Sequence, residues 1–232
     1  MYFNKLNNFF HGIMFHHFHD HNVHKKGQGS ISQEQFYKLL EFIGIRNIIN
    51  SDIFFHKFFD NKLSNKNICL TFDDAIKSQI DIALPVLKQL KIKAFFFINT
   101  SIFTGNPDKL EVYRHFRLNK YKCVNTFYNE FYKYVPQNID EFLKKYTNQL
   151  KKLKLQYPHY SFEDLKFRLI RDILLTRYQY DQIMTIMMTE KKFVPKHYFK
   201  YLFFSKEDLK KLFNEGHTIG LHTHTHPTNI AN

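Results

Sequence analysis

The chain has 232 residues, of which 44% are hydrophobic and 24% are charged, and it contains only 7 Gly and 6 Pro. These proportions exclude a wholly disordered chain and a collagen-like one. No apolar run approaches the roughly 18 residues of a membrane-spanning helix, and the N-terminus shows no secretory signal, so we expect a cytoplasmic protein. With only two cysteines, we expect neither a disulfide framework nor a cysteine-based zinc site.

The net charge of +13 is concentrated in the middle of the chain. Residues 104–200 carry 19 Lys and Arg against 10 Asp and Glu, whereas residues 1–103 carry 12 against 8 and residues 201–232 carry 3 against 3. We interpret this excess first as a solvated Lys-rich surface. A basic surface also attracts acidic substrates and anionic membranes, which we keep as partners to be considered.

The first hundred residues alternate between strand and helix patterns. Short apolar runs predict buried strands at residues 12–16, 68–72 and 93–98. A capping box formed by Ser32 and Gln35 predicts the start of one helix, and Pro85 fits the first turn of another. Apolar strands separated by helices predict a parallel sheet covered on both faces, which is the α/β class.

The middle of the chain has helical spacing and no strand pattern. One helical face is formed by Leu143, Tyr146, Leu150 and Leu153. Glycine is absent between Gly105 and Gly216, as expected for helices rather than hairpins. The stretch is too long for a plain loop. We therefore expect residues 104–200 to form a basic, all-helical insertion.

The α/β pattern resumes after this stretch. Ser205 predicts a helix start, Gly216 predicts its end, and residues 218–222 predict a fourth strand. We accordingly divide the chain into an N-terminal α/β part (1–103), the helical insertion (104–200) and a continuation of the α/β part (201–232).

Two neighbouring carboxylates, Asp73 and Asp74, follow the second predicted strand. The carboxyl ends of parallel strands are where α/β proteins place their ligands. Adjacent strand residues point to opposite sides, so we expect one carboxylate to bind a cation and the other to accept a proton. The alternative is that the pair only ends the strand and caps the next helix.

A histidine cluster follows the fourth predicted strand, at His222, His224 and His226. If the segment stays extended, all three share one face, and neighbouring rings can bind one metal ion. If it turns, His222 and His226 approach each other instead. Pro227 disfavours a helical conformation at His226, so the spacing alone does not decide. A solvated His-rich turn is the alternative without a ligand.

Together, a carboxylate and two imidazoles at the ends of two strands are the ligands of a catalytic zinc site with an open position. Such a site supports metal-assisted hydrolysis, in which a free carboxylate takes a proton from water.

The residues around both clusters resemble a known family. Residues 70–75, Leu-Thr-Phe-Asp-Asp-Ala, resemble the first motif of the polysaccharide deacetylases, the NodB-type family-4 carbohydrate esterases that remove N-acetyl groups from sugars. Residues 220–227, which end in His-Pro, resemble their second motif, and residues 83–87 and 92–97 match the helix and strand between the motifs. Residues 13–17 resemble the opening of several branches, including the one that makes bacterial surface polysaccharides.

The resemblance implies a partial (β/α) barrel and a role for each matching residue. Asp73 would be the general base, and one divalent ion, with zinc preferred, would bind to Asp74, His222 and His226. Thr71 and Thr223 occupy supporting positions of the motifs, whereas His224 lies at a variable one. His16 and His17 follow the first strand, and we treat them as candidates for contacting the substrate or supplying a proton.

The sequence departs from the family pattern in two places. Asp74 and His222 are 148 positions apart, farther than usual, because the helical stretch intervenes. The family's later motifs, including a late histidine that acts as general acid, have no counterpart before Asn232, so we expect a C-terminally truncated barrel.

Three functions follow from these observations. The first is a metal-dependent N-deacetylase acting on an amino-sugar glycan or its precursor, including a precursor that a phosphate group links to a carrier. The second is an inactive protein of this family that binds metal or sugar. The third is a basic nucleic-acid-binding protein, which rests on charge alone and which we do not expect.

Overall fold

The computed structural model describes residues 11–226, and the chain divides into two compact units. The first unit contains the residues up to Val112 together with those from Lys196 onward, and the second is Tyr113–Pro195. The second unit lies within the stretch 104–200 that we predicted as an insertion, and the assignment of these parts as domains stays a prediction.

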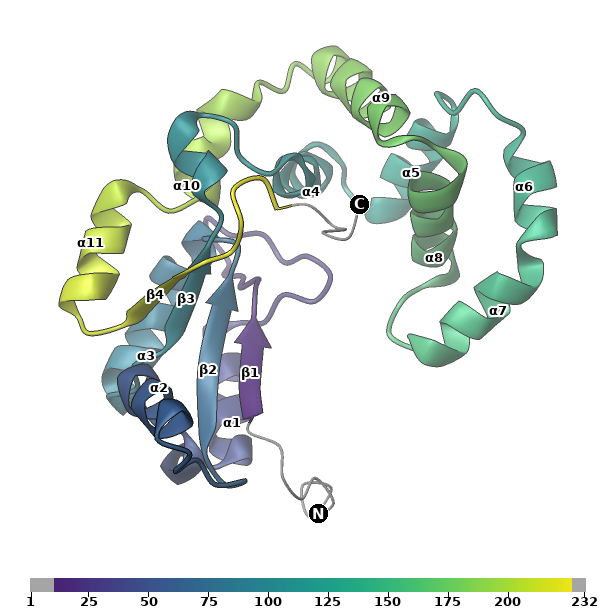
Figure 1. The fold of residues 1–232 in the computed structure, drawn as a ribbon. Helices are drawn as coiled ribbons and strands as arrows, with labels where there is room; N and C mark the ends of the chain where they lie inside the picture. Colours follow the sequence, from purple (N-terminus) through teal and green to yellow (C-terminus); the bar gives the residue numbers. More distant parts are fainter. Residues whose placement is uncertain (1–10, 227–232) are drawn as a thin grey trace. The chain divides into compact units, whose positions relative to one another are not determined.

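A parallel four-stranded sheet forms the centre of the first unit (Figure 1). Its strands are β1 (His11–Phe15), β2 (Ile68–Asp73), β3 (Phe95–Ile98) and β4 (Thr218–Leu221). Each strand pairs with the one before it, in the order β1-β2-β3-β4, so every crossover advances in the same direction. This succession is that of a (β/α) barrel, and four strands form part of one. The predicted α/β class with a parallel sheet is confirmed.

The helical segments of the first unit occupy the connections between strands. They are α1 (Gln33–Ile43), η2 (Ile45–Asn47), α2 (Ser51–Phe59), η3 (Gln79–Ala83), α3 (Leu84–Leu90), η4 (Thr100–Thr104), the start of α4 (Lys109–Lys120), α10 (Phe199–Leu202) and α11 (Lys206–Asn214). The short η6 (Pro195–Tyr198) lies at the boundary of the units.

The predicted starts of two helices and the predicted end of one of them are confirmed. Ser32 and Gln35 form a capping box at α1, and Ser205 forms one with Asp208 at α11. Gly216 follows the last residues of α11 with φ of 84°, a conformation that costs glycine little.

One face of the sheet carries the core of the first unit. The rings of Phe15, Phe72 and Phe96, on three neighbouring strands, stack with centroids 5.6 and 4.7 Å apart. Apolar side chains of α1, α3 and α11 pack in the same cluster, among them Leu40, Leu87 and Leu212. Burying these rings against helices fixes which face of each strand points outward from the barrel.

The opposite face is covered only in part. Phe54 of α2 packs edge-on against Phe95, and Ser51 accepts a hydrogen bond from Thr218 at 2.8 Å. Met14 of β1, however, keeps 58% of its surface exposed. The expectation of a sheet covered on both faces is therefore wrong at β1, which is an edge strand of the sheet.

The second unit is helical throughout. It contains the rest of α4, then α5 (Val124–Tyr132), α6 (Ile139–Lys145), α7 (Thr147–Gln156), α8 (Phe162–Leu169), η5 (Ile170–Leu174) and α9 (Arg177–Glu190). Aromatic side chains of α5, α8 and α9 pack together, and the ring centroids of Phe131 and Phe167 lie 5.1 Å apart. A second cluster joins α7 to α8 through Leu150, Leu165 and Leu169.

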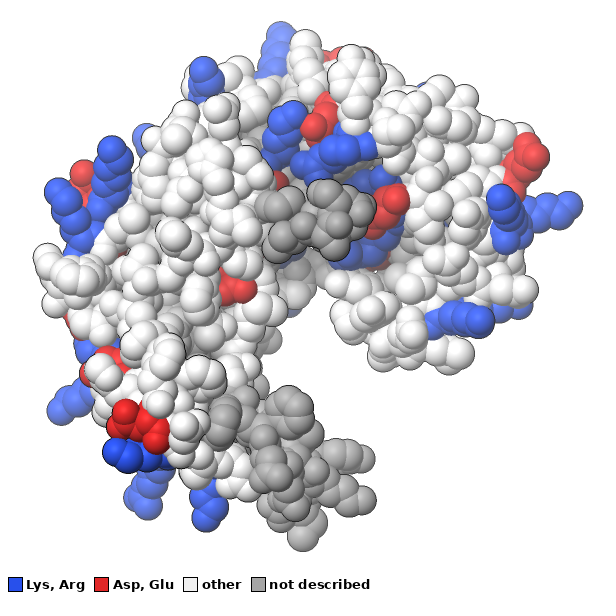
Figure 2. Space-filling model, in the orientation of Figure 1, with Lys and Arg blue, Asp and Glu red and all other residues white. Residues whose placement is uncertain are grey.

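Within residues 11–226, no helix has both the length and the apolar character needed to cross a membrane. Basic and acidic side chains are interspersed over the face of the molecule seen in Figure 2.

Candidate metal centre

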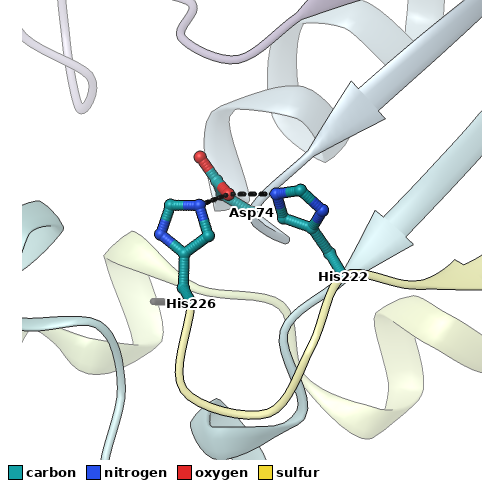
Figure 3. A group of neighbouring side chains, drawn as sticks. All are labelled: Asp74, His222 and His226. Carbon is teal, nitrogen blue, oxygen red and sulfur yellow. Dashed lines mark ion pairs between the residues drawn. The ribbon is translucent and has the colours of Figure 1, made fainter. Parts of the chain in front are cut away.

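The carboxyl ends of β2 and β4 bring a carboxylate and two imidazoles together (Figure 3). Nε2 of His226 lies 3.2 Å from Oδ1 of Asp74, and Nε2 of His222 lies 3.5 Å from the same oxygen. The three prospective ligand atoms all lie within 4.8 Å of one another. The set matches the three residues that the resemblance assigned to a metal ion.

A local backbone reversal aims Asp74 at the histidines. β2 ends at Asp73, and the next two residues, Asp74 and Ala75, have φ of 73° and 53°. The left-handed region costs a non-glycine residue roughly 1–2 kcal/mol, and aspartate tolerates it better than most. Because alternation along the strand stops there, Asp74 leaves the pleat and turns toward the strand ends.

The segment after β4 turns rather than staying extended. The backbone of Thr223 and His224 accepts hydrogen bonds from the N–H groups of Thr100 and Ser101, at 3.3 and 3.0 Å. The hydroxyl of Thr223 accepts a hydrogen bond from the backbone N–H of His226 at 3.0 Å. Thr223 and His226 are left-handed, with φ of 64° and 51°.

This turn decides which histidines meet. The rings of His222 and His226 lie 5.0 Å apart, whereas Nδ1 of His224 lies 2.8 Å from the hydroxyl of Thr100. Of the two arrangements that the spacing allowed, the structure therefore shows the one that pairs His222 with His226. Pro227 lies outside the described residues.

The donor set fits a divalent cation. Oδ1 of Asp74 is buried and accepts no well-aligned hydrogen bond, although His226 Nε2 is near it. An orphaned buried carboxylate oxygen is costly unless a cation compensates it. One carboxylate and two imidazoles leave positions open for further ligands, as in catalytic zinc sites.

The surroundings of the cluster shift the pKa values of both Asp74 and His226. Burial raises the pKa of Asp74, and the nearby imidazoles of His226, His16 and His222 offset part of that rise. Burial alone would lower the pKa of His226, but the hydrogen bond to Asp108 and the charges of Asp74 and Asp108 together raise it. The carboxylates around His226 therefore favour a positive charge at this point, whether on the ring or on a bound cation.

Asp73 is the second carboxylate of the pair and lies at the last position of β2. It is buried, and its Oδ1 has no hydrogen-bond partner. Its backbone carbonyl accepts a 2.6 Å hydrogen bond from the amide of Gln79, which also donates to the carbonyl of His16 at 3.0 Å. Gln79 thus fixes the ends of β1 and β2 against each other, a role that the sequence did not indicate.

The remaining predicted residues lie near the same edge of the sheet. Nε2 of His16 is 3.7 Å from Oδ2 of Asp74, so His16 borders the cluster. His17 instead contacts Glu111 of α4, with Nε2 2.9 Å from the carboxylate. Thr71 lies two residues before Asp73 in β2, in register with Met14 and Phe95.

Asp108 was not predicted as a site residue. It is buried, and its Oδ2 lies 3.0 Å from Nδ1 of His226. Its position just before α4 marks it in the sequence as a helix cap, and only the fold brings it to a histidine 118 positions away.

A family comparison agrees with the resemblance. Residues 60–173 match the family model described as polysaccharide deacetylase. Over this range the chain is similar to the polysaccharide deacetylases. The matched range includes Asp73 and Asp74 and extends into the second unit, and it ends before His222 and His226.

Two solved structures are also similar. One is the deacetylase PplD of Streptococcus pyogenes in complex with acetate, at 20% identity over 41% of this chain and 45% of that one, with a TM-score of 0.34. The other is IcaB from Ammonifex degensii, at 21% identity over 40% of this chain and 39% of that one, with a TM-score of 0.30. The matched part spans less than half the length of either structure, and no curated protein matches the sequence.

Proposed function

We propose that this protein is a metal-dependent deacetylase that removes N-acetyl groups from the amino sugars of a polysaccharide or its precursor. The observation that carries the proposal is the convergence of Asp74, His222 and His226, with a second buried carboxylate, Asp73, immediately before Asp74 in the chain. The match to the polysaccharide deacetylase model supports this class of substrate, and the donor set supports a divalent ion, with zinc preferred.

Each residue has a distinct task in this reaction. Asp74, His222 and His226 would hold the cation, which when bound would polarise the amide carbonyl and acidify water. Asp73 directly precedes Asp74 at the end of β2 and has an unpartnered oxygen, so we assign to it the acceptance of a proton from the attacking water.

The departing amine needs a proton, and His16 is the candidate donor. Its ring borders Asp74 and is only partly buried, with 33% of the side chain exposed. An imidazole that remains accessible can exchange protons with solvent between turnovers. His17 is engaged by Glu111, so we assign to it no proton transfer.

Metal content and acetate release test these roles separately. We expect about one zinc ion per wild-type chain, and acetate release from N-acetylglucosamine oligomers. Asp74→Ala and His222→Ala should lose both the metal and the activity. Asp73→Asn and His16→Gln should keep the metal and lose about 10²- to 10⁴-fold in acetate release, the usual contribution of a general acid or base.

His224→Ala is the matched control, because His224 belongs to the same turn but contacts Thr100. It should retain metal. Metal content that is unchanged in Asp74→Ala and His222→Ala would contradict the site. Metal binding without acetate release in the wild type would favour a binding protein over an enzyme.

A nucleic-acid-binding function has less support. It rests on net charge alone, and on the face drawn in Figure 2 acidic side chains lie among the basic ones.

A further inference from the structure

Asp108 contacts one of the two prospective histidine ligands on the side away from the metal position. His226 turns Nε2 toward Asp74 and Nδ1 toward Oδ2 of Asp108, at 3.2 and 3.0 Å. The Asp108 side chain is only 7% exposed. Its other oxygen, Oδ1, accepts a hydrogen bond from the backbone N–H of Leu110 at 2.9 Å, so the carboxylate is held on both sides.

The chemistry of imidazole gives this contact a consequence. A neutral histidine carries one proton, and a metal ion can bind only the nitrogen that lacks it. A carboxylate that accepts the Nδ1 proton keeps Nε2 free for the metal and fixes the plane of the ring. His226 needs such support because its own backbone is left-handed, at φ of 51°, and its side chain is partly exposed.

We propose that Asp108 is a positioning residue of the metal centre, which selects the Nε2-binding tautomer of His226 and orients its ring. The inference rests on the proposed metal site and adds to it a residue that does not touch the cation. The first turn of α4 thereby becomes part of the metal centre, since the same carboxylate caps the helix and orients the ligand.

Helix capping alone is the competing explanation, and two substitutions separate it from positioning. Serine is as good a cap as aspartate but is too short to reach Nδ1 of His226, so Asp108→Ser keeps the cap and removes the contact. Asparagine also caps helices, but its amide N–H₂ would face Nδ1 as a donor. Asp108→Asn would thus favour the tautomer that carries its proton on Nε2, the nitrogen that the metal needs.

The experiment measures zinc affinity by competition with a chromophoric chelator. We expect Asp108→Ser and Asp108→Asn to bind zinc about 10- to 100-fold more weakly than the wild type, the usual effect of losing an outer carboxylate. Helix content from circular dichroism should be unchanged. Glu111→Gln is the matched control, because it removes from the same turn a negative charge that also acts on His226, while the Glu111 carboxylate lies 2.9 Å from Nε2 of His17. It should change the affinity less than threefold.

Two further measurements exclude a merely structural role. In the zinc-loaded wild type, ¹⁵N–¹H spectra should show a slowly exchanging Nδ1 proton on His226, and Asp108→Ser should make that proton exchange faster. In a His226→Ala background, Asp108→Ser should have no further effect on zinc affinity, because Asp108 acts through His226.

The outcomes distinguish failure of the proposed metal-dependent function from failure of the role proposed for Asp108. A wild type that binds no zinc would overturn the proposed function and this inference with it. A wild type that binds zinc, with both Asp108 variants within twofold of it, would overturn this inference alone. An equal loss of affinity in the His226→Ala background would also overturn it and leave helix capping as the role of Asp108.

Discussion

Backbone strain at the level of single residues accumulates around the candidate site. Of the seven non-glycine residues with positive φ in the described chain, four lie at the metal centre: Asp74, Ala75, Thr223 and His226. Each such conformation costs of order 1–3 kcal/mol and persists only where the surroundings hold it in place. Here the holding contacts are the Thr223 hydroxyl on the backbone of His226 and the carbonyl of Ala75, which accepts from Phe204 at 2.9 Å.

The same strain explains what the sequence could and could not predict about the site. Strand alternation predicted different roles for Asp73 and Asp74, but it placed both in the pleat, whereas Asp74 follows the last strand residue in a left-handed conformation. No pattern of residue types specifies that reversal in an aspartate. Likewise the spacing of His222 and His226 left two arrangements open, and contacts with the residues after β3 decide between them.

His217 is a buried titratable residue away from the metal centre. Its Nδ1 accepts a hydrogen bond from the N–H of Ala94 at 3.1 Å, and its ring packs edge-on against Phe96. Burial, together with the charge of Lys93, lowers the pKa of His217 from its ordinary 6.5 to about 4. The folded state therefore holds this ring neutral at a pH where the unfolded chain protonates it.

Lowering the pH should thus destabilise the fold through His217. Its contribution is fully present above pH 6.5 and is lost as the pH falls toward 4, because the unfolded state binds the extra proton. The His217→Asn variant keeps an acceptor for the N–H of Ala94 but does not titrate. Between pH 7 and pH 5, we expect the free energy of unfolding of the wild type to fall by about 2 kcal/mol more than that of this variant. Urea unfolding at both pH values measures this, and equal losses in the two proteins would contradict it.

At the level of elements, the predicted strands and capped helices formed because their signals are local. Each apolar run became a strand with ends shifted by one or two residues, and the capping boxes at Ser32 and Ser205 start α1 and α11. α2 was not predicted. Its N-cap residue Asn50 does not cap it but accepts from the N–H of Lys93 at 2.8 Å, and several of its apolar side chains stay exposed, including Phe55 and Phe59. A helix held by such distant contacts gives no local signal.

β4 carries His222 to the site, and one glycine allows it to lie against β3. A Cβ atom on Gly220 would lie 2.5 Å from Cδ1 of Phe97, a distance that real structures do not tolerate. Gly220→Ala should therefore displace the ring or the strand and destabilise the protein by about 1–3 kcal/mol, as overpacking does. Because the shift moves His222, zinc affinity should fall as well.

Chemical denaturation and zinc competition measure both effects. Gly12→Ala is the matched control, since the added Cβ on β1 would meet Cys69 and Thr71 at an ordinary 3.7 Å. Gly12→Ala should leave the free energy of unfolding and the zinc affinity nearly unchanged. A Phe97→Leu background should relieve part of the Gly220→Ala penalty. If the penalty is the same there, the clash with the ring is not its cause.

On the scale of the whole molecule, the metal centre joins segments that are distant in the chain. Asp74 follows β2, whereas His222 and His226 follow β4, and the entire second unit lies between them in sequence. Without a cation, the buried Oδ1 of Asp74 at these contacts has no compensating partner. A cation that binds only the folded arrangement should therefore stabilise the first unit by mass action.

We expect zinc at 100 times its dissociation constant to stabilise this fold by about 2.7 kcal/mol. For a chain of this size, that corresponds to a rise of roughly 5–10 °C in Tm.

Hydrogen exchange should show which residues zinc stabilises: the amides of residues 74–76 and 222–226 should become more protected together. Amides of α6 and α7, whose apolar side chains pack with Leu165 and Leu169, provide the internal reference. His222→Ala should show no zinc-dependent protection at either segment. Zinc-dependent protection of one segment without the other would mean that the cation does not bridge β2 and β4.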